Sequence, residues 1–387
     1  MKRAVSLALA FLLLLPCLSL AGCGRQEQGG QDDARVITDM AGRTVELPLE
    51  VERIACQSST CEAVIISLGK ATKLVGTTDY TDESSFAFQL FPELSQVTKL
   101  ADDMSVEEML EKDVQVVFVK DTNKISKYEE AGLTVIYVEL DTVAGTKEGV
   151  KLIGQVIGAE DRAAKCVEYI DRCETTVTER MQGSEAFTAY YARAKYAESN
   201  LLTTYAAGHI YSEWIGFSGG SVITKDMELA ETKGGVLISG EELLRSDPDV
   251  IFIGGYYRNP VFRDAMTGEY STVLRAVTQG RVFMVPTSVT DWSVGGCELG
   301  LTILWCAQQV APDRFSDIDM AEELIASRYA DDVYASFTYT DDELDAYYAE
   351  NADSYDRVNV LYTLISAAAN EDEGIDADTA KTAAEDK

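Results

Sequence analysis

A long helical segment with a single apolar stripe, residues 160–182, most constrains how this chain can fold. Its apolar residues recur at spacings of three and four: Ala163, Val167, Ile170, Cys173, Val177 and Met181. This spacing puts them on one face of a helix about 35 Å long. The steps do not keep the strict alternation of a coiled coil. A helix of this length with one apolar face can join two lobes, so the sequence predicts a connecting helix.

Strand-like and helical patterns alternate on both sides of this segment. The predicted strands before it are residues 53–56, 74–78, 114–119 and 134–139, with helical patterns at 61–68 and 106–111. The predicted strands after it are residues 188–194, 248–255 and 281–286, with a helix ending at 214–217 and another starting at 241–245. This order is typical of mostly parallel sheets covered on both faces. The predicted fold class is therefore α/β, with two Rossmann-like lobes joined by one long helix.

The length of 387 residues supports two lobes, because a single core stops growing at roughly 250–300 residues. We expect an N-terminal lobe over residues 35–146 and a helical connection over 147–182, in which a first helix at 147–157 ends at Gly158. A C-terminal lobe is expected over residues 183–365. Residues 366–387 form an acidic tail to which we assign no function.

The N-terminus predicts export. Lys2 and Arg3 precede an apolar run over residues 4–20, and small residues then lead to Cys23. This pattern is typical of a signal peptide, residues 1–22, that ends in a lipoprotein processing site. Cys23 would then carry lipid, and residues 24–34 would form a flexible linker. An uncleaved membrane anchor is the alternative, and it leaves the same domain tethered outside the same membrane.

Six cysteines follow Cys23. Cys166 and Cys173 lie about 10.5 Å apart along the predicted helix, too far to bridge each other, and small buried residues are the better interpretation. Export permits disulfides. Cys56 with Cys61, or Cys297 with Cys306, can pair locally, and the sequence does not choose between them.

Composition argues against several classes of function. A formal net charge of −32 repels nucleic acid and anionic membrane surfaces. His209 is the only histidine, which removes most zinc-enzyme and Ser/His/Asp schemes. Residues 216–220 match the G-x-S-x-G pattern of hydrolases, but that chemistry needs a histidine after the serine. The sequence therefore predicts a protein that is not an enzyme and has no intrinsic cofactor.

Five segments in order resemble one family. They are VITDMAGRTVELPLEVERIAC (36–56), MSVEEMLEKDVQVVFV (104–119), ISGEELLRSDPDVIFIGG (238–255), VFMVPTSVTDW (282–292) and LWCAQQVAPDRFSDID (304–319). They resemble blocks of the substrate-binding lipoproteins of ABC importers for ferric siderophores, haem and cobalamin. The resemblance implies two lobes on a rigid helix, with ligand held in the cleft between them. It also implies delivery to an ABC permease and its ATPase from an anchored, extracytoplasmic position.

The resemblance further implies two docking residues. In this family a surface glutamate on each lobe binds arginine pockets of the permease, and Glu107 and Glu241 stand at the matching positions. Two carboxylates on a rigid body fix orientation through charge-assisted bonds. Each also suits the first turn of a helix. The neighbours Glu108 and Glu242 leave the assignment open by one position.

Ligand-binding residues are expected in the loops at the carboxyl ends of the strands. Tyrosine and tryptophan offer large faces to an aromatic or planar ligand, and arginine can bind an anionic chelate. Gln57, Asp79, Lys120 and Asp121 follow strands of the first lobe, and Thr204 and Tyr205 lie in the second. The candidate ligand-binding residues are Ser58, Ser59, Thr60 and Tyr80 in the first lobe, and Tyr196, Tyr256, Tyr257, Arg258, Asp291 and Trp292 in the second.

The expected ligand is an iron complex, namely a ferric siderophore or haem, or a corrinoid. An oxyanion such as molybdate or tungstate is the alternative, because Ser58, Ser59 and Thr60 can offer hydrogen-bond donors at a helix N-terminus. Capture of a free zinc or manganese ion usually needs several histidines. His209 is a weak candidate haem ligand, and a histidine without special function is the more economical interpretation.

Overall fold

The structure is a computed structural model that describes residues 35–78, 91–100, 105–194, 197, 199–205, 208–227, 230–232, 235–255, 257–289 and 291–329. The predicted signal peptide, the linker and the acidic tail lie outside the described residues. The chain divides into two compact units, of which unit 1 is Met1–Ala163 with Thr287–Gly296, and unit 2 is Ala164–Pro286 with Cys297–Lys387. Within the described residues, no helix is long and apolar enough to span a membrane.

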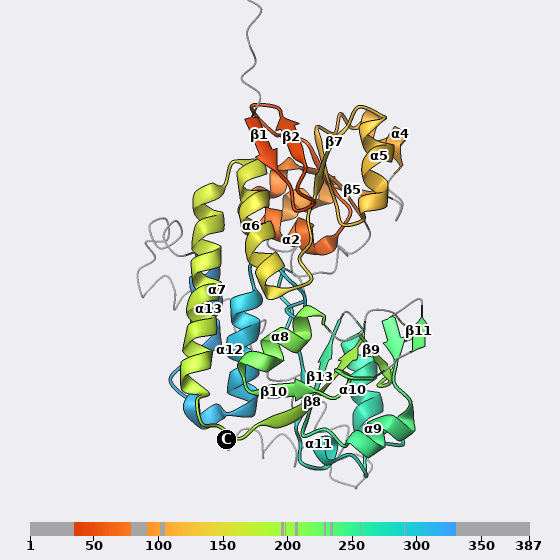
Figure 1. Cartoon of the computed structure of the whole chain (residues 1–387), viewed down its shortest axis with the longest axis vertical. Helices are drawn as coiled ribbons and strands as arrows, with labels where there is room; N and C mark the ends of the chain where they lie inside the picture. Colours follow the sequence, from red (N-terminus) through yellow and green to blue (C-terminus); the bar gives the residue numbers. More distant parts are fainter. Residues whose placement is uncertain are drawn as a thin grey trace, which may run out of the picture. The chain divides into compact units, whose positions relative to one another are not determined.

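Unit 1 is built on a parallel sheet of five strands in the order β5-β4-β3-β6-β7. Figure 1 labels its two edge strands, β5 and β7. These strands are β3 (Ile54–Cys56), β4 (Leu74–Thr78), β5 (Thr98–Leu100), β6 (Val116–Val119) and β7 (Thr134–Tyr137). All residues of β3 and β6 are buried, as expected of central strands covered on both faces. The helices of this unit are α2 (Ser59–Ser67), α4 (Val106–Glu111), α5 (Ile125–Glu129) and α6 (Val143–Ile157), with 3-10 turns η1 (Ala71–Lys73), η2 (Pro92–Gln96) and η3 (Thr122–Lys124).

Helices cover both faces of this sheet. Met109 of α4 and Tyr128 of α5 pack with Val117 and Val119 of β6 on one face. Alternate strand residues such as Phe118 face the other way and are also buried. The N-cap of helix α6 is Thr142, whose side chain accepts a hydrogen bond from Gly145 N, and its C-cap is Gly158, with a left-handed φ of 69°.

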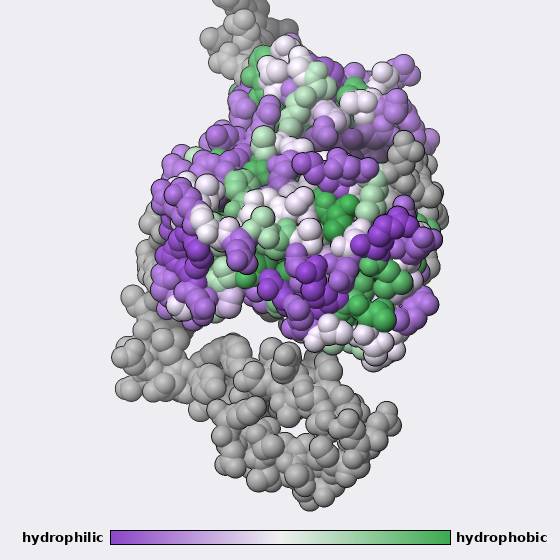
Figure 2. Space-filling model, turned by 60° about the horizontal axis from the view of Figure 1, so that its bottom comes forward, coloured by the Kyte–Doolittle hydropathy of each residue, from purple (hydrophilic) through white to green (hydrophobic). Residues whose placement is uncertain are grey.

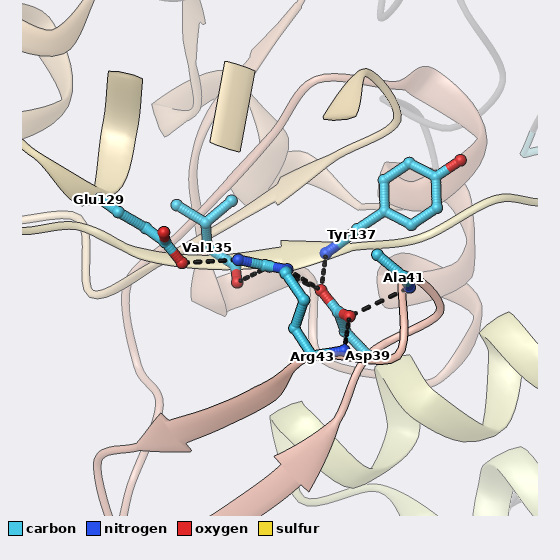
Figure 3. Close-up of polar contacts among 6 residues, drawn as sticks. All are labelled: Asp39, Ala41, Arg43, Glu129, Val135 and Tyr137. Atoms are coloured by element: carbon cyan, nitrogen blue, oxygen red, sulfur yellow. Dashed lines mark hydrogen bonds and ion pairs between the residues drawn. The ribbon is translucent and has the colours of Figure 1, made fainter. Parts of the chain in front are cut away.

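A two-stranded antiparallel hairpin precedes the sheet of unit 1, formed by β1 (Arg35–Thr38) and β2 (Thr44–Leu47). An ionic cluster fastens it to β7 (Figure 3). The carboxylate of Asp39 is buried and accepts hydrogen bonds from Arg43 and from Tyr137 N. Arg43 also donates to Glu129 of α5 and to the carbonyl of Val135.

Unit 2 contains a second parallel sheet, in the order β10-β8-β13-β14. Its strands are β8 (Phe187–Arg193), β10 (Gly220–Val222), β13 (Val250–Gly254) and β14 (Val282–Met284). A small antiparallel sheet lies beside it in the order β11-β12-β9, formed by β9 (Thr203–Thr204), β11 (Ala230–Thr232) and β12 (Gly235–Leu237). The remaining helices are α7 (Glu160–Arg180), α8 (Ile210–Phe217), α9 (Gly240–Ser246), α10 (Arg258–Thr267), α11 (Arg275–Thr278), α12 (Leu299–Val310) and α13 (Met320–Tyr329), with the 3-10 turn η4 (Pro312–Arg314).

The central strands of unit 2 are also covered on both faces. Tyr190 and Ile253 pack with Val261 of α10 on one face. On the other face the ring of Phe252 lies 5.4 Å from Trp214 of α8 and 5.7 Å from Trp305 of α12, measured between centroids. The predicted α/β class with two units built on parallel sheets is therefore confirmed.

The predicted connecting helix is α7, along which the chain passes from unit 1 to unit 2. All residues of its predicted apolar stripe are buried. Tyr169 and Arg172 of this helix bind the carboxylate of Glu323 in α13, and Arg180 pairs with Asp317. Most of α7 is therefore an integral helix of unit 2.

Two boundaries differ from the prediction. Unit 1 does not end near residue 146, because α6 packs on α2 and belongs to this unit. In addition, Thr287–Gly296 returns to unit 1, where Gly295 lies against Leu140 and Thr146. The contact of this segment with unit 1 joins residues that are far apart in the sequence, so no local sequence pattern predicts it.

Candidate functional site

The sheet of unit 1 reverses its winding between β3 and β6, and ligands of open α/β sheets bind at such a position. Because the strands are parallel, the loops that follow them meet at one edge. The backbone N–H of Gln57 donates to the carbonyl of Phe118 at 2.9 Å, and the side-chain Oε1 of Gln57 accepts from Lys120 N at 3.1 Å. These hydrogen bonds join two loops that were predicted to line the site.

The N-terminus of α2 carries the three predicted hydroxyl residues. Ser58 is the N-cap, and its Oγ accepts from Thr60 N at 3.2 Å. Ser59 and Thr60 are half-buried in the first turn. Glu62 is buried in the same turn and accepts a hydrogen bond from Thr77 at 2.7 Å. The carboxylate of Glu62 offsets the positive end of the helix dipole, which makes this helix N-terminus less favourable for a bound anion.

The sheet of unit 2 reverses its winding between β8 and β13. The loops after these strands are joined, because Ala194 N donates to Gly254 O and Tyr257 N donates to Ala194 O, both at 2.7 Å. Gly255 has a φ of 114°, which favours glycine at this turn. Arg258 begins α10 and is half-buried, whereas Tyr257 is 43% exposed. Both predicted residues therefore lie at the carboxyl edge of this sheet.

A cluster of aromatic and cationic side chains stands at the same edge of unit 2. We define the Tyr205 cluster as Tyr191, Arg193, Tyr205, His209 and Tyr211. The guanidinium carbon of Arg193 lies 4.2 Å from the ring centroid of Tyr205, and the His209 ring stacks on Tyr205 at 4.0 Å. Tyr191 and Tyr211 stack at 4.6 Å. Tyr191 and Tyr211 are buried, whereas Tyr205, His209 and Arg193 are half-buried, so the accessible part of the cluster combines aromatic rings with a cation held by aromatic contact.

His209 occupies a defined position in this cluster. It is the N-cap of α8, and its carbonyl accepts from Ser212 N and from the Ser212 hydroxyl. The hydroxyl of Tyr211 donates to the carbonyl of Tyr205 at 3.0 Å, and burial raises the pKa of Tyr211. Across the described residues, no three His, Cys, Asp or Glu side chains gather as a metal site.

Sequence reasoning missed Arg193, Tyr191 and Tyr211. The detectable signal was weak: Tyr191 and Arg193 alternate along β8, and Arg193 is the last residue of that strand. A charged residue at a strand end is usually a solvated one. Only the fold shows that Arg193 precedes the loop that meets Tyr257.

Asp291 and Trp292 were assigned to the second lobe, and this assignment was wrong. Both belong to the segment that returns to unit 1, and both are buried. Trp292 Nε1 donates to the hydroxyl of Ser288 at 2.7 Å, and Asp291 accepts from Ser293 N at 3.0 Å. These contacts fold the segment on itself.

The predicted docking glutamates differ from their neighbours in environment. Glu107 is exposed in the first turn of α4, and hydrogen bonds from its own backbone and from Ser105 lower the pKa of its carboxyl. Glu241 is exposed on α9 and pairs with Arg245 at 2.8 Å. Glu242 is instead committed to a capping box with Ser239.

Exposed leucines accompany the two glutamates: Leu110 follows Glu107 on α4, and Leu244 follows Glu241 on α9. Figure 2 shows one face of the molecule, on which hydrophobic residues appear in groups among hydrophilic ones. Each glutamate therefore lies on a helix that offers both a carboxylate and an apolar side chain to a partner.

Four predicted residues, Tyr80, Tyr196, Tyr256 and Cys23, lie outside the described residues, as does Asp79. The G-x-S-x-G pattern is a glycine turn that follows a helix: α8 ends before Ser218, which is buried, and Gly219 has a φ of 80°. The six described cysteines are buried free thiols. The neighbouring Cys297 thiol, together with burial, raises the pKa of the Cys166 thiol.

In each of the two α/β units, the strand order of a parallel sheet reverses its winding beside a group of loops. Ligands of open α/β sheets bind at such positions. The sequence matches the periplasmic binding protein family over residues 54–289. The chain therefore belongs to this family, whose members serve ABC importers from an extracytoplasmic position.

Individual relatives are distant. The molybdate-binding protein MolA of Haemophilus influenzae is 22% identical over 333 residues, which cover 79% of this chain and 91% of MolA. The structure of MolA bound to molybdate has a TM-score of 0.65 at 21% identity and covers 77% of this chain and 98% of MolA.

Two further solved structures share the fold. Helicobacter pylori CeuE with Ni(II) bound has a TM-score of 0.65 at 17% identity and covers 81% of this chain and 99% of its own. The heme binding protein HmuT has a TM-score of 0.54 at 17% identity and covers 72% of this chain and 90% of its own.

Proposed function

We propose that this protein captures an anionic iron complex, namely a ferric siderophore or haem, or a corrinoid, and delivers it to an ABC permease. The observation that carries this proposal is the Tyr205 cluster at the carboxyl edge of the sheet in unit 2. Tyr205 and His209 are half-buried and stack at 4.0 Å, so they offer ring surface to a planar or aromatic ligand, and the buried rings of Tyr191 and Tyr211 pack against Tyr205.

The charge of the cluster supports an anionic ligand. In a chain with a formal charge of −32, Arg193 and Arg258 are brought to neighbouring loops by the hydrogen bond from Tyr257 N to Ala194 O. Two guanidinium groups can bind the carboxylates of haem or the anionic groups of a ferric chelate through charge-assisted hydrogen bonds.

An oxyanion such as molybdate is the second candidate, and the similarity to MolA favours it. The donors would come from Ser59 and Thr60 at the N-terminus of α2. Two features of that turn oppose it: Ser58 already uses Thr60 N as its capping partner, and Glu62 is a buried acid nearby. We therefore rank the larger anionic ligands first.

Delivery would use Glu107 and Glu241 as two carboxylates for arginines of the permease. Glu241 is the better placed of its pair, because Glu242 is held by Ser239. Its ion pair with Arg245 is exposed and easily exchanged for a partner's guanidinium. We further propose that lipid on Cys23 anchors the mature protein to the membrane.

A thermal-shift panel tests the ligand class. The soluble domain from Gly24 onward is heated with ferric siderophores, haemin, cobalamin, molybdate or tungstate. A ligand at about a hundred times its Kd stabilises the folded state by roughly 2.7 kcal/mol. We expect a selective shift with one iron complex or corrinoid, whereas a shift with molybdate or tungstate alone would establish the second candidate.

The Tyr205 cluster is tested with a matched pair of variants. Arg193→Gln removes the cation that lies over Tyr205, and Arg263→Gln removes an exposed arginine of α10. We expect Arg193→Gln to weaken binding of the selected ligand at least tenfold, because a charged hydrogen bond contributes about 1.5–3 kcal/mol. Equal affinities in the two variants would remove the cluster from the ligand site.

A further inference from the structure

Two buried thiols flank the loop that carries the hydroxyl residues of unit 1. Cys56 is the last residue of β3, and Cys61 lies in the first turn of α2. Their Sγ atoms are 3.7 Å apart. Both side chains are almost fully buried, at 0% and 1% exposure. The four residues between them include the N-cap Ser58 and Gln57, which joins this loop to Lys120.

We propose that Cys56 and Cys61 form a disulfide in the exported protein and that this bond locks the Gln57–Thr60 loop onto the sheet. A disulfide needs a sulfur separation of about 2.05 Å, so the two sulfurs must approach by roughly 1.7 Å. Cys56 ends β3 and Cys61 lies in the first turn of α2, so the bond would join the strand end to the helix start. The extracytoplasmic family position gives the oxidising setting.

The chemistry is thiol–disulfide exchange with a disulfide oxidant, either an oxidoreductase or a small molecule such as oxidised glutathione. One cysteine thiolate attacks the oxidant disulfide, forms a mixed disulfide and releases one thiolate. The second cysteine thiolate then attacks the mixed disulfide, closes the Cys56–Cys61 bond and releases the second. The two protons lost by the cysteines are taken up by the two released thiolates. The protein pair is oxidised by two electrons, and the oxidant is reduced by two.

The burial of the two thiols determines when the bond forms. Loss of solvent, together with the neighbouring Cys61 and Glu62, raises the pKa of the Cys56 thiol, so the folded protein holds little thiolate. The bond therefore forms before the core closes, and the folded protein then shields it from reductants. Closing this loop fixes the end of β3 to the start of α2 and holds Ser58, Ser59 and Thr60 in a preorganised turn.

A peptide map of the exported protein tests the bond directly. The protein is denatured and alkylated without reductant, and then digested with trypsin. Residues 54–70 form one tryptic peptide that contains both cysteines. We expect this peptide to be unalkylated and lighter by two hydrogen atoms than its reduced form. The peptide 173–180 is the internal reference, because the thiol of Cys173 contacts Tyr169 and should be alkylated once. Two alkyl groups on the 54–70 peptide would overturn the proposal.

The locking role is tested by unfolding with and without reductant. We expect reduction to lower the Tm of the wild type by about 4–8 °C and to leave the Cys56→Ser/Cys61→Ser variant unchanged. An undiminished effect of reductant on the double variant would refute the lock. Both tests are made without ligand, so they fail or succeed independently of the proposed transport function.

Discussion

Replacement of Asp39 by alanine should cost unit 1 a large part of its stability. The Asp39 carboxylate is 4% exposed and is the centre of the cluster in Figure 3. Its Oδ1 accepts from Ala41 N and Arg43 N, both at 3.0 Å. Its Oδ2 accepts from Arg43 Nη2 at 2.6 Å and Nε at 3.0 Å, and from Tyr137 N at 3.0 Å.

The expected loss in free energy of unfolding follows from the groups that lose their partner when Asp39 is replaced. Arg43 keeps its contacts with Glu129 and with the carbonyl of Val135, but its guanidinium loses the buried anion that it faces. Three backbone amides lose their acceptor at the same time. Breaking a buried pair from one side costs about 3–5 kcal/mol. That is a large fraction of the roughly 5–15 kcal/mol that stabilises a typical domain.

Urea denaturation, followed by circular dichroism, measures this loss. Glu129→Gln is the matched control, since it removes the other anion of Arg43 at a side chain that is 48% exposed. We expect this control to lose less than about 1 kcal/mol. Hydrogen exchange should locate the effect of Asp39→Ala in β1, β2 and β7, because the cluster joins these strands.

If Asp39→Ala and Glu129→Gln lose similar free energies of unfolding, Asp39 does not hold the hairpin to the sheet. Normal hydrogen-exchange protection of residues 35–47 in Asp39→Ala would lead to the same conclusion.

Three other outcomes follow from local geometry. Ser239→Ala removes the capping box of α9 and should lower the free energy of unfolding by about 1 kcal/mol in urea titration, and an unchanged value would refute the capping role. Burial and a hydrogen bond with Glu139 raise the pKa of Tyr137 to about 12, so its neutral form is favoured by folding. Its stabilising effect should be complete below the unfolded pKa of about 10 and disappear as the pH rises through about 12. A tyrosinate absorbance titration should show a lower midpoint in Glu139→Gln than in the wild type, because the hydrogen bond and charge of Glu139 contribute to the shift, and an unchanged midpoint would refute that contribution. Gly295→Ala would push a methyl group against the carbonyl of Leu140 and should cost about 1–3 kcal/mol in thermal unfolding, whereas wild-type stability would show that the segment is loosely packed.

The central strands and the long helix could be predicted because their signals are local. The strands β6 and β13 are continuous apolar runs, as strands covered on both faces require. The stripe of α7 keeps a helical period over its whole length. Each element is encoded by residues that are close together in the sequence.

Elements that depend on distant partners could not be predicted in this way. The hairpin of β1 and β2 has only four residues in each strand, and its anchor joins Asp39 to Tyr137 across the unit. The start of α6 was missed because its glycines weaken the helical signal. Gly149 is needed there, because a side chain would collide with Val138 and Leu140.

The candidate site was predicted in part. Parallel strands fix where loops meet, so the positions of Ser58 and Arg258 followed from the strand assignments. Trp292 was assigned to the wrong unit, because the return of its segment is a tertiary event. Arg193 was missed because its proposed role depends on its contact with the ring of Tyr205, which no sequence pattern indicates.

The central claim is that this chain delivers a bound solute to an ABC permease, and stimulated ATP hydrolysis by that permease in proteoliposomes tests it most directly. The ligand-loaded protein should raise the rate, Glu107→Arg/Glu241→Arg should abolish the rise, and Glu111→Arg, at an exposed site on the same helix as Glu107, should preserve it. No stimulation by the loaded wild type, or equal stimulation by the Glu107→Arg/Glu241→Arg variant, would contradict the account.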